Sequence, residues 1–525
     1  MYTNKILKGS IAVAIVAFVF SSCTKDIAVS GVQYTILNPT KTDALAGNWK
    51  TVIADTAQMY GVVAPVSITS SDYKDQLDAI KTAQANITTN QQTAINYWGA
   101  GNTLRWNEIM RALVSKYNLV PAPNADNSYS FPDQTNPFAY PQFPFCNPPY
   151  AARSYAYSSV VVYDALVVCA KMQQQFKRAA PYANDASVKK LLPSTTTPSY
   201  PSSEAVIATA SVELLKFLFP TEVDFLNAKA IEAKDVAFVS GLATKSDIAA
   251  AETLGKAVAA LVLVRAKTDG MKNAIGNASL WDSLANRNVV RTVNNVETAV
   301  KDPMWYSLDF PQRPPMLPFF GNVKAWSFAK AADVRVAAPP VASSDAIQTQ
   351  LAESLNFSQN ATRDQLALVH FWADGLGTYT PPGHWNAIAA DLIQAAQLSE
   401  VRTARTYALL NMAMMDAAIT CWDIKYYYYY PRPSVLDPRI KTLTGLPNFP
   451  GYTSGHSTFS NAAATVLGYV FPNNATDLKA QAEQASASRI YGAIHLRIDC
   501  EVGLQSGAKI GNLLVARAKA DGADQ

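Results

Sequence analysis

The sequence is poor in the residues on which many binding functions depend. It has four His and five Cys among 525 residues, 16% charged residues and a formal net charge of only +4. Without a basic run or an array of stacking aromatic residues, this small charge argues against nucleic acid as a partner. The cysteines show no CxxC or similar spacing, which excludes the usual zinc motifs. After the first 23 residues we find no second long apolar stretch, so we expect no membrane-spanning helix there.

Alternating polar and apolar runs, the pattern of half-buried strands, are also few. Helical periodicity prevails instead, for example over residues 73–86, 202–219 and 400–422. The hydrophobic fraction of 49% is that of an ordinary packed globular chain. The sequence therefore predicts a mostly α protein.

The first residues have the pattern of a targeting segment. Lys5 and Lys8 precede an apolar run that ends at Phe20 and is followed by Ser21-Ser22-Cys23. This arrangement resembles a bacterial lipoprotein signal, which implies removal of residues 1–22 and lipidation of Cys23, although a simple secretory signal is the alternative. We expect a lipid-anchored protein of the bacterial cell envelope, at the periplasmic or outer-membrane face.

The rest of the chain contains an internal duplication. Residues 152–181 align without a gap on 404–433, and the same offset of 252 residues pairs 200–220 with 452–472 and 265–270 with 517–522. We therefore expect two tandem helical bundles, an N-terminal copy (70–270) and a C-terminal copy (346–525). A lead segment (23–69) precedes them, and a connector rich in Pro and aromatic residues (271–345) joins them.

Residues that carry chemistry are present in only one copy. The framework residues Arg153, Asp164 and Cys169 recur as Arg405, Asp416 and Cys421, and we interpret them as packing and ion-pair residues. Five reactive or charged positions differ at the same offset: Lys425 against Gln173, Arg432 against Ala180, His456 against Glu204, Arg489 against Ala237, and His495 against Ala243. This asymmetry predicts an active site in the C-terminal copy and a structural N-terminal copy.

Three segments contribute these residues: 425–433 (KYYYYYPRP), 450–456 (PGYTSGH) and 488–499 (SRIYGAIHLRID). Arg432 and Arg489 offer forked donors that match an oxyanion, and Lys425 adds a compact cation. Ser454 and the backbone N–H of Gly455 can donate further hydrogen bonds if a helix begins there. Taken singly, the Tyr run could be a buried aromatic element, and Ser-Gly-His a helix cap. Together the three segments predict an oxyanion pocket.

Two histidines supply the remaining chemistry. One can bond to the central atom of the oxyanion while the other moves protons. Asp499 follows His495 by four residues, so on a helix it would accept the second ring N–H and orient the imidazole. The other two histidines, His370 and His384, match no motif. We expect a structural or surface role for them, with His384 in a loop.

The three segments resemble the signature of the superfamily that contains type 2 phosphatidic acid phosphatases and vanadium-dependent haloperoxidases. The resemblance implies that Lys425, Arg432, Ser454, Gly455 and Arg489 bind phosphate or vanadate oxygens. It implies further that His495 is the vanadate ligand or the phosphorylated nucleophile, and that His456 is the acid-base. Thr453 departs from the pattern, since the family usually has Pro before Ser-Gly-His.

The resemblance leaves two chemistries open. A haloperoxidase would use vanadate, hydrogen peroxide and a halide, whereas an acid phosphatase would need no cofactor and act on a phosphomonoester. The duplicated scaffold, the similarity of residues 370–385 to bacterial haloperoxidase-like proteins, and Phe449, placed where chloroperoxidases have a pocket aromatic, favour the peroxidase. A lipoprotein that binds oxyanions without turnover is a third possibility, which the presence of both His456 and His495 makes less attractive.

Overall fold

The computed structural model describes residues 34–129, 145–193, 198–293 and 296–524. The expected signal segment (1–22) and Cys23 lie outside this part of the chain. The elements of the N-terminal copy are α1 (Ser71–Ala85), α2 (Thr89–Trp98), α3 (Asn102–Tyr117), α4 (Pro148–Phe176), α5 (Pro181–Asn184), α6 (Ser203–Leu218), α7 (Val223–Val239) and α8 (Lys245–Thr268). The connector contains α9 (Ala278–Ala285) and an antiparallel hairpin of β1 (Val289–Val293) and β2 (Val296–Val300).

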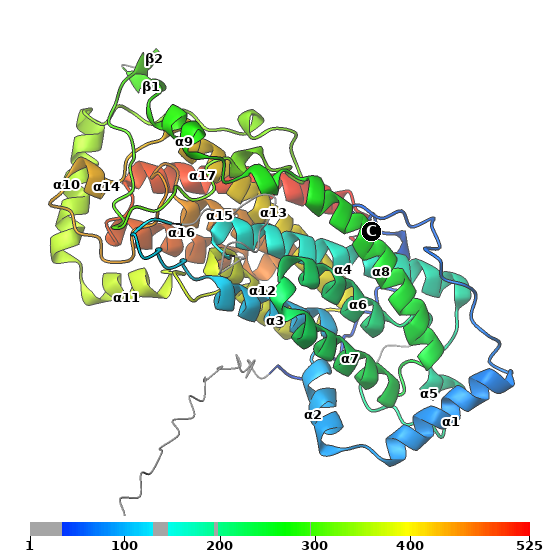
Figure 1. Cartoon of the computed structure of the whole chain (residues 1–525). Helices are drawn as coiled ribbons and strands as arrows, with labels where there is room; N and C mark the ends of the chain where they lie inside the picture. Colours follow the sequence, from blue (N-terminus) through cyan, green and yellow to red (C-terminus); the bar gives the residue numbers. More distant parts are fainter. Residues whose placement is uncertain (1–33, 130–144, 194–197, 294–295, 525) are drawn as a thin grey trace, which may run out of the picture.

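The C-terminal copy repeats the helices of the first. Its elements are α10 (Asp345–Asn360), α11 (Arg363–Phe371), α12 (Thr380–Ala396), α13 (Glu400–Tyr428), α14 (Pro433–Leu436), α15 (Gly455–Val470), α16 (Ala475–Tyr491) and α17 (Arg497–Lys519). Figure 1 shows the N-terminal copy, in blue to green, beside the C-terminal copy, in yellow to red. The predicted mostly α fold is confirmed, with the small hairpin as the β structure of the described residues.

The long helices α4 and α13 start and stop by the same local devices. Asn147 caps α4 by accepting from the N–H of Tyr150 at 3.1 Å, and Ser399 caps α13 by accepting from Arg402 N–H at 3.3 Å. Each helix ends at a left-handed residue, Lys177 or Tyr429, with φ of 52° and 51°. The two helices are therefore the same element built twice, and α13 extends beyond the expected end at residue 422 into the Tyr run.

Framework residues hold each copy together in the same way. Arg153 pairs with Asp269 at 2.7 Å, and Arg405 pairs with Asp521 at 2.7 Å. Asp164 accepts from backbone N–H groups of the lead segment, including Val52 at 2.7 Å. Its counterpart Asp416 accepts from the connector, at Trp326 and Ser327. The lead segment is thus held against the N-terminal copy, and the connector against the C-terminal copy, by equivalent carboxylates.

The four cysteines in the described part, Cys146, Cys169, Cys421 and Cys500, are free and buried. One described helical stretch, Pro148–Asn184, is long and apolar enough to cross a membrane, although the sequence led us to expect none after residue 23. Inside the protein, 83% of its most apolar window is buried, because α4 packs against α13 and α6. Burial of this kind explains its apolar character without a bilayer.

Candidate active site

The site is assembled from the ends of five helices of the C-terminal copy. Lys425 lies in the last turn of α13, Arg432 caps α14, Ser454 caps α15, Arg489 lies in the last turn of α16, and Asp499 lies in the first turn of α17. His456 is in the first turn of α15, and His495 is in the short loop before α17. The structure therefore brings all three predicted segments to one place.

A cavity of about 200 Å³ opens onto these residues. Five of the predicted site residues line it: Phe449, Gly455, His456, Arg489 and His495. The others, Lys425, Arg432, Ser454 and Asp499, are fully buried behind the lining. The connector contributes Arg313 and Met316 to the wall, so this segment borders the cavity.

His495 is oriented by two neighbours. Its Nδ1 lies 3.0 Å from Oδ2 of Asp499, which also accepts from the N–H of Leu496 at 3.1 Å. Its Nε2 lies 3.4 Å from Nη1 of Arg432. Burial, with the charge of Arg432 second, holds the pKa of His495 well below its usual value. Nδ1 therefore carries the proton, and Nε2 presents a lone pair.

The two arginines are fixed by backbone carbonyls. Arg432 donates to Phe449 O at 2.9 Å and to Ile494 O at 2.8 Å, and Arg489 donates to Val369 O at 2.8 Å. Burial lowers the pKa of each to about 10, so both stay protonated near neutral pH. Nη2 of Arg432 has no hydrogen-bond partner within the described structure. A buried cationic donor of this kind needs an acceptor.

Lys425 is engaged with the loop that precedes Ser454. Its Nζ donates to Pro450 O at 2.7 Å and Gly451 O at 2.8 Å, and it lies 5.0 Å from the ring centre of Phe449. Burial lowers the pKa of Lys425 and raises the pKa of the nearby Asp499 carboxyl. Lys425 thus supports the loop as well as contributing charge.

Ser454 and Gly455 open α15 as the pattern predicted. Ser454 Oγ accepts from Ser457 N–H at 3.3 Å, and its own N–H donates to Asp499 O at 2.8 Å. A Cβ on Gly455 would approach Phe459 only to 3.7 Å, so crowding does not demand glycine there. Gly455 and His456 begin α15 and line the cavity, so the positive end of the helix dipole lies at the cavity.

His456 belongs to a second cluster that sequence reasoning missed. Asp374 Oδ2 lies 3.9 Å from Nε2 of His456, while Asp374 Oδ1 lies 3.0 Å from Nδ1 of His384. Trp372 stacks on His384 with ring centres 4.5 Å apart. Nε2 of His456 itself has no hydrogen bond in the described structure. Burial and then the charge of Arg489 hold the pKa of His456 well below its usual value.

The prediction that His384 lies in a loop was wrong. Thr380 and Pro381 begin α12, and His384 lies near its N-terminus, buried, with 8% of its surface exposed. The Pro-Pro-Gly sequence was a signal for a helix start as well as for a loop. No local pattern could have indicated its approach to Asp374. His370, by contrast, is exposed on α11.

Phe449 forms one wall of the site. Its ring lies 4.9 Å from Trp422 and 5.1 Å from the guanidinium carbon of Arg432. It is 7% exposed. An aromatic ring against two cations at a cavity edge provides a partly apolar surface for a small polarisable ligand.

Comparison with known proteins agrees with this geometry. Residues 406–521 match the family model of the PAP2 superfamily, whereas no curated protein matches the chain in sequence. A solved bacterial vanadium-dependent iodoperoxidase has a TM-score of 0.54 and 22% identity, covering 70% of this chain and 91% of that one. A holo bacterial vanadium-dependent chloroperoxidase has a TM-score of 0.52 and 14% identity, covering 74% and 96%. Residues 406–521 thus match the PAP2 superfamily, as the resemblance implied, and the chain shares the fold of these peroxidases.

Proposed function

We propose that this protein is a vanadium-dependent haloperoxidase with its active site in the C-terminal copy. The observation that carries the proposal is the pairing of a neutral His495, held through Nδ1 by Asp499 at 3.0 Å, with a buried Arg432 Nη2 that has no partner among the described groups. A lone pair and an unsatisfied cationic donor beside one cavity are what a tetrahedral oxyanion requires.

Vanadate fits this set of residues. His495 Nε2 would hold its central atom, and Arg432, Arg489, Lys425, Ser454 Oγ and the Gly455 N–H would hold its oxygens. When bound, vanadate supplies an electrophilic centre that activates hydrogen peroxide toward halide, for the overall reaction H2O2 + X⁻ + H⁺ → HOX + H2O. The donors are fixed by carbonyls before the anion arrives, so they need no reorganisation to stabilise developing negative charge.

His456 would act as the proton-transfer group. Its Nε2 has no partner in the described structure, and Asp374 at 3.9 Å can stabilise its protonated form. Without a bound anion, burial keeps the imidazole neutral. An oxyanion nearby would raise the pKa of His456 toward the working range and let it take a proton from peroxide and return one to water.

An acid phosphatase is the second candidate, favoured by the match to the PAP2 superfamily. In that reaction His495 Nε2 would attack phosphorus as the ester oxygen leaves with a proton from His456, and water would then hydrolyse the phosphohistidine. The peroxidase is preferred because the Phe449 and Trp422 wall and the fold shared over most of both peroxidases accompany the donors.

The deciding experiment measures bromination of a dimedone-type reporter with hydrogen peroxide and bromide, before and after addition of orthovanadate. We expect activity that requires vanadate and is suppressed by phosphate. The same preparation is tested for hydrolysis of p-nitrophenyl phosphate. Hydrolysis inhibited by vanadate, without bromination or iodination, would assign the protein to the phosphatases.

We also propose that the chain is anchored to the bacterial envelope through a lipidated Cys23. Support comes from the Lys5 and Lys8 pattern and the Ser-Ser-Cys sequence. Mass spectrometry of the mature N-terminal peptide tests this directly. An unmodified N-terminus at another residue would indicate simple secretion instead.

A further inference from the structure

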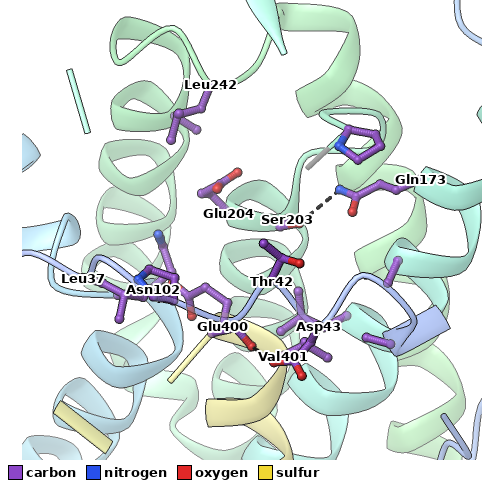
Figure 2. Close-up of a pocket in the computed structure, with 18 of the residues that line it drawn as sticks. Leu37, Thr42, Asp43, Asn102, Gln173, Ser203, Glu204, Leu242, Glu400 and Val401 are labelled. Atoms are coloured by element: carbon purple, nitrogen blue, oxygen red, sulfur yellow. Dashed lines mark hydrogen bonds between the residues drawn. The ribbon is translucent and has the colours of Figure 1, made fainter. Parts of the chain in front are cut away.

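A second and larger cavity, of about 420 Å³, lies in the N-terminal copy (Figure 2). Its lining includes Gln173, Ser203, Glu204, Ala237 and Leu242, which stand 252 residues before Lys425, Gly455, His456, Arg489 and Ile494. We call it the N-terminal cavity. It occupies the position of the active site in the copy that has lost the reactive residues, and its volume falls within the usual range for small-molecule pockets.

Each cavity is completed by the other copy. Glu400, the first residue of α13, lines the N-terminal cavity, and its equivalent Pro148, the first residue of α4, lines the active-site cavity. Glu400 accepts from the backbone N–H groups of Asn102, at 2.5 Å, and Thr103, at 3.0 Å, at the start of α3. The carboxylate is therefore fixed in place by a helix N-terminus.

The charge of this cavity is opposite to that of the active site. Glu204 replaces His456, Ala237 replaces Arg489 and Gln173 replaces Lys425, which leaves Glu204 and Glu400 facing the same space (Figure 2). Burial raises the pKa of Glu400 above its usual value. Hydrogen bonds from Thr103 and Asn102 oppose this rise, and the charge of Glu204 adds a smaller increase. Ser202 Oγ donates to Glu204 at 2.9 Å.

The other charged groups of the lining do not neutralise this pair. Asp43 is held by Arg402 at 2.5 Å, which accounts for both of those charges. Lys177 is the one cation in the lining among the described residues, and it is exposed to solvent. The interior of the cavity is consequently acidic.

The lining also contains a buried polar atom that a ligand could satisfy. Asn102 also lines the cavity, is 6% exposed, and its Oδ1 has no hydrogen-bond partner in the described structure. A buried acceptor left without a donor is destabilising. Two carboxylates and a free amide oxygen together form an acceptor-rich lining that suits a ligand with several N–H donors.

Much of the remaining lining is apolar, including Leu37, Trp98, Val236, Leu242 and Val401. A divalent ion such as Ca²⁺ would need six to eight oxygen ligands in a far smaller space. We propose that the N-terminal cavity binds a small organic cation, a protonated amine whose ammonium group lies between Glu204, Glu400 and Asn102 while its hydrocarbon part packs on Trp98 and Leu242. The proposal is independent of the reaction catalysed in the C-terminal copy.

Isothermal titration calorimetry of the full-length protein tests this with hexylammonium chloride, sodium hexanoate and 1-hexanol as probes of equal chain length. We expect hexylammonium to bind one to one and the other two at least about tenfold more weakly, because only the cation pairs with the carboxylates. Glu204→Gln keeps the shape and should weaken hexylammonium about tenfold or more. The matched control is Glu213→Gln on the same helix, outside the cavity, which should bind like the wild type.

A second variant tests the location without changing charge. Ala237→Leu places a larger side chain in the cavity from α7, and a folded protein with this change should lose hexylammonium binding. Absence of hexylammonium binding to the wild type at millimolar concentration would overturn the proposal. So would equal affinity in Glu204→Gln and wild type, or equal affinity for hexylammonium and hexanol.

Discussion

Ser159 and Asn411 are separated by 252 residues and hydrogen-bond to each other, with Nδ2 of Asn411 2.8 Å from Oγ of Ser159. They occupy the same position in the two copies. Asn107 and Asn386, each of which follows a tryptophan in its own copy, also hydrogen-bond directly at 2.7 Å. When equivalent residues contact each other, the two copies are related by an approximate two-fold axis. This axis explains why each copy supplies residues to the cavity of the other.

Mutations of the two active-site histidines should have different effects on vanadate binding and on rate. We expect His495→Ala to abolish turnover and weaken vanadate binding, since it removes the ligand atom, whereas His456→Ala should keep vanadate binding and lose about a hundredfold or more in rate. Steady-state bromination and calorimetric titration with orthovanadate measure the two effects. His370→Ala, on the exposed face of α11, is the control. Equal loss of vanadate binding in both active-site variants would contradict the assigned roles.

Asp499→Asn should disturb His495 without removing it. The carboxylate fixes the proton on Nδ1, and replacement of such a partner typically costs 10–100-fold, so we expect about tenfold weaker vanadate binding with a larger loss of rate. Calorimetry and steady-state kinetics on the same preparation measure both. Vanadate affinity at the wild-type level would show that Asp499 does not orient the ligand nitrogen.

Asp374→Asn should act through His456. Loss of the negative charge 3.9 Å away lowers the pKa of His456 in the anion-bound enzyme, so the limb of the rate profile that reports its protonation should move to lower pH. The measurement is kcat against pH with saturating substrates. Asp364→Asn, an exposed carboxylate on α11, is the matched control and should leave the profile in place.

Stability of the anion-free protein should fall in acid because His456 is buried and neutral. Its folded pKa lies below the unfolded value of 6.5, so the unfolded chain binds a proton that the native protein does not, and the free energy of unfolding decreases as pH falls below 6.5. The slope is about 1.4 kcal/mol per pH unit for one proton until the folded pKa is reached. Denaturant unfolding at pH 7.5 and pH 5.5 should show a smaller acid loss in His456→Asn than in the wild type. Equal losses would mean that native His456 is already protonated.

The paired framework arginines should matter for stability in both copies. Arg153→Ala and Arg405→Ala each leave a buried aspartate, Asp269 or Asp521, without its main partner, so we expect about 3–5 kcal/mol of destabilisation in each case. Denaturant midpoints measure this. Lys479→Ala, an exposed cation paired with Glu483 at 3.7 Å on α16, should change stability by less than about 1 kcal/mol. A negligible effect in either framework variant would contradict the structural role that we assign to the repeated residues.

Much of this organisation could be predicted from the sequence because it depends on local or repeated patterns. Helical periodicity and the caps at Ser454 and Thr362 mark helices to within a few residues. The spacing of His495 and Asp499 predicted their contact, although His495 lies in the loop before α17 and only Asp499 lies on the helix. The structure keeps the 252-residue offset, because helices such as α4 and α13 begin 252 residues apart. These features are encoded within a few turns of chain, where backbone hydrogen bonding and side-chain spacing decide the geometry.

Tertiary packing alone decided the rest. The approach of Asp374 to both His384 and His456, and the engagement of Lys425 with two loop carbonyls, join segments whose separation in sequence carries no signal. The acidity of the N-terminal cavity likewise depends on tertiary packing, because Glu400 of the C-terminal copy lies in its wall. The sequence by itself determined which residues could bind an oxyanion. It also determined that the N-terminal copy lacks them. Only the packing of α4 against α13 decided how the two cavities are closed, because that contact depends on the shapes of whole helices.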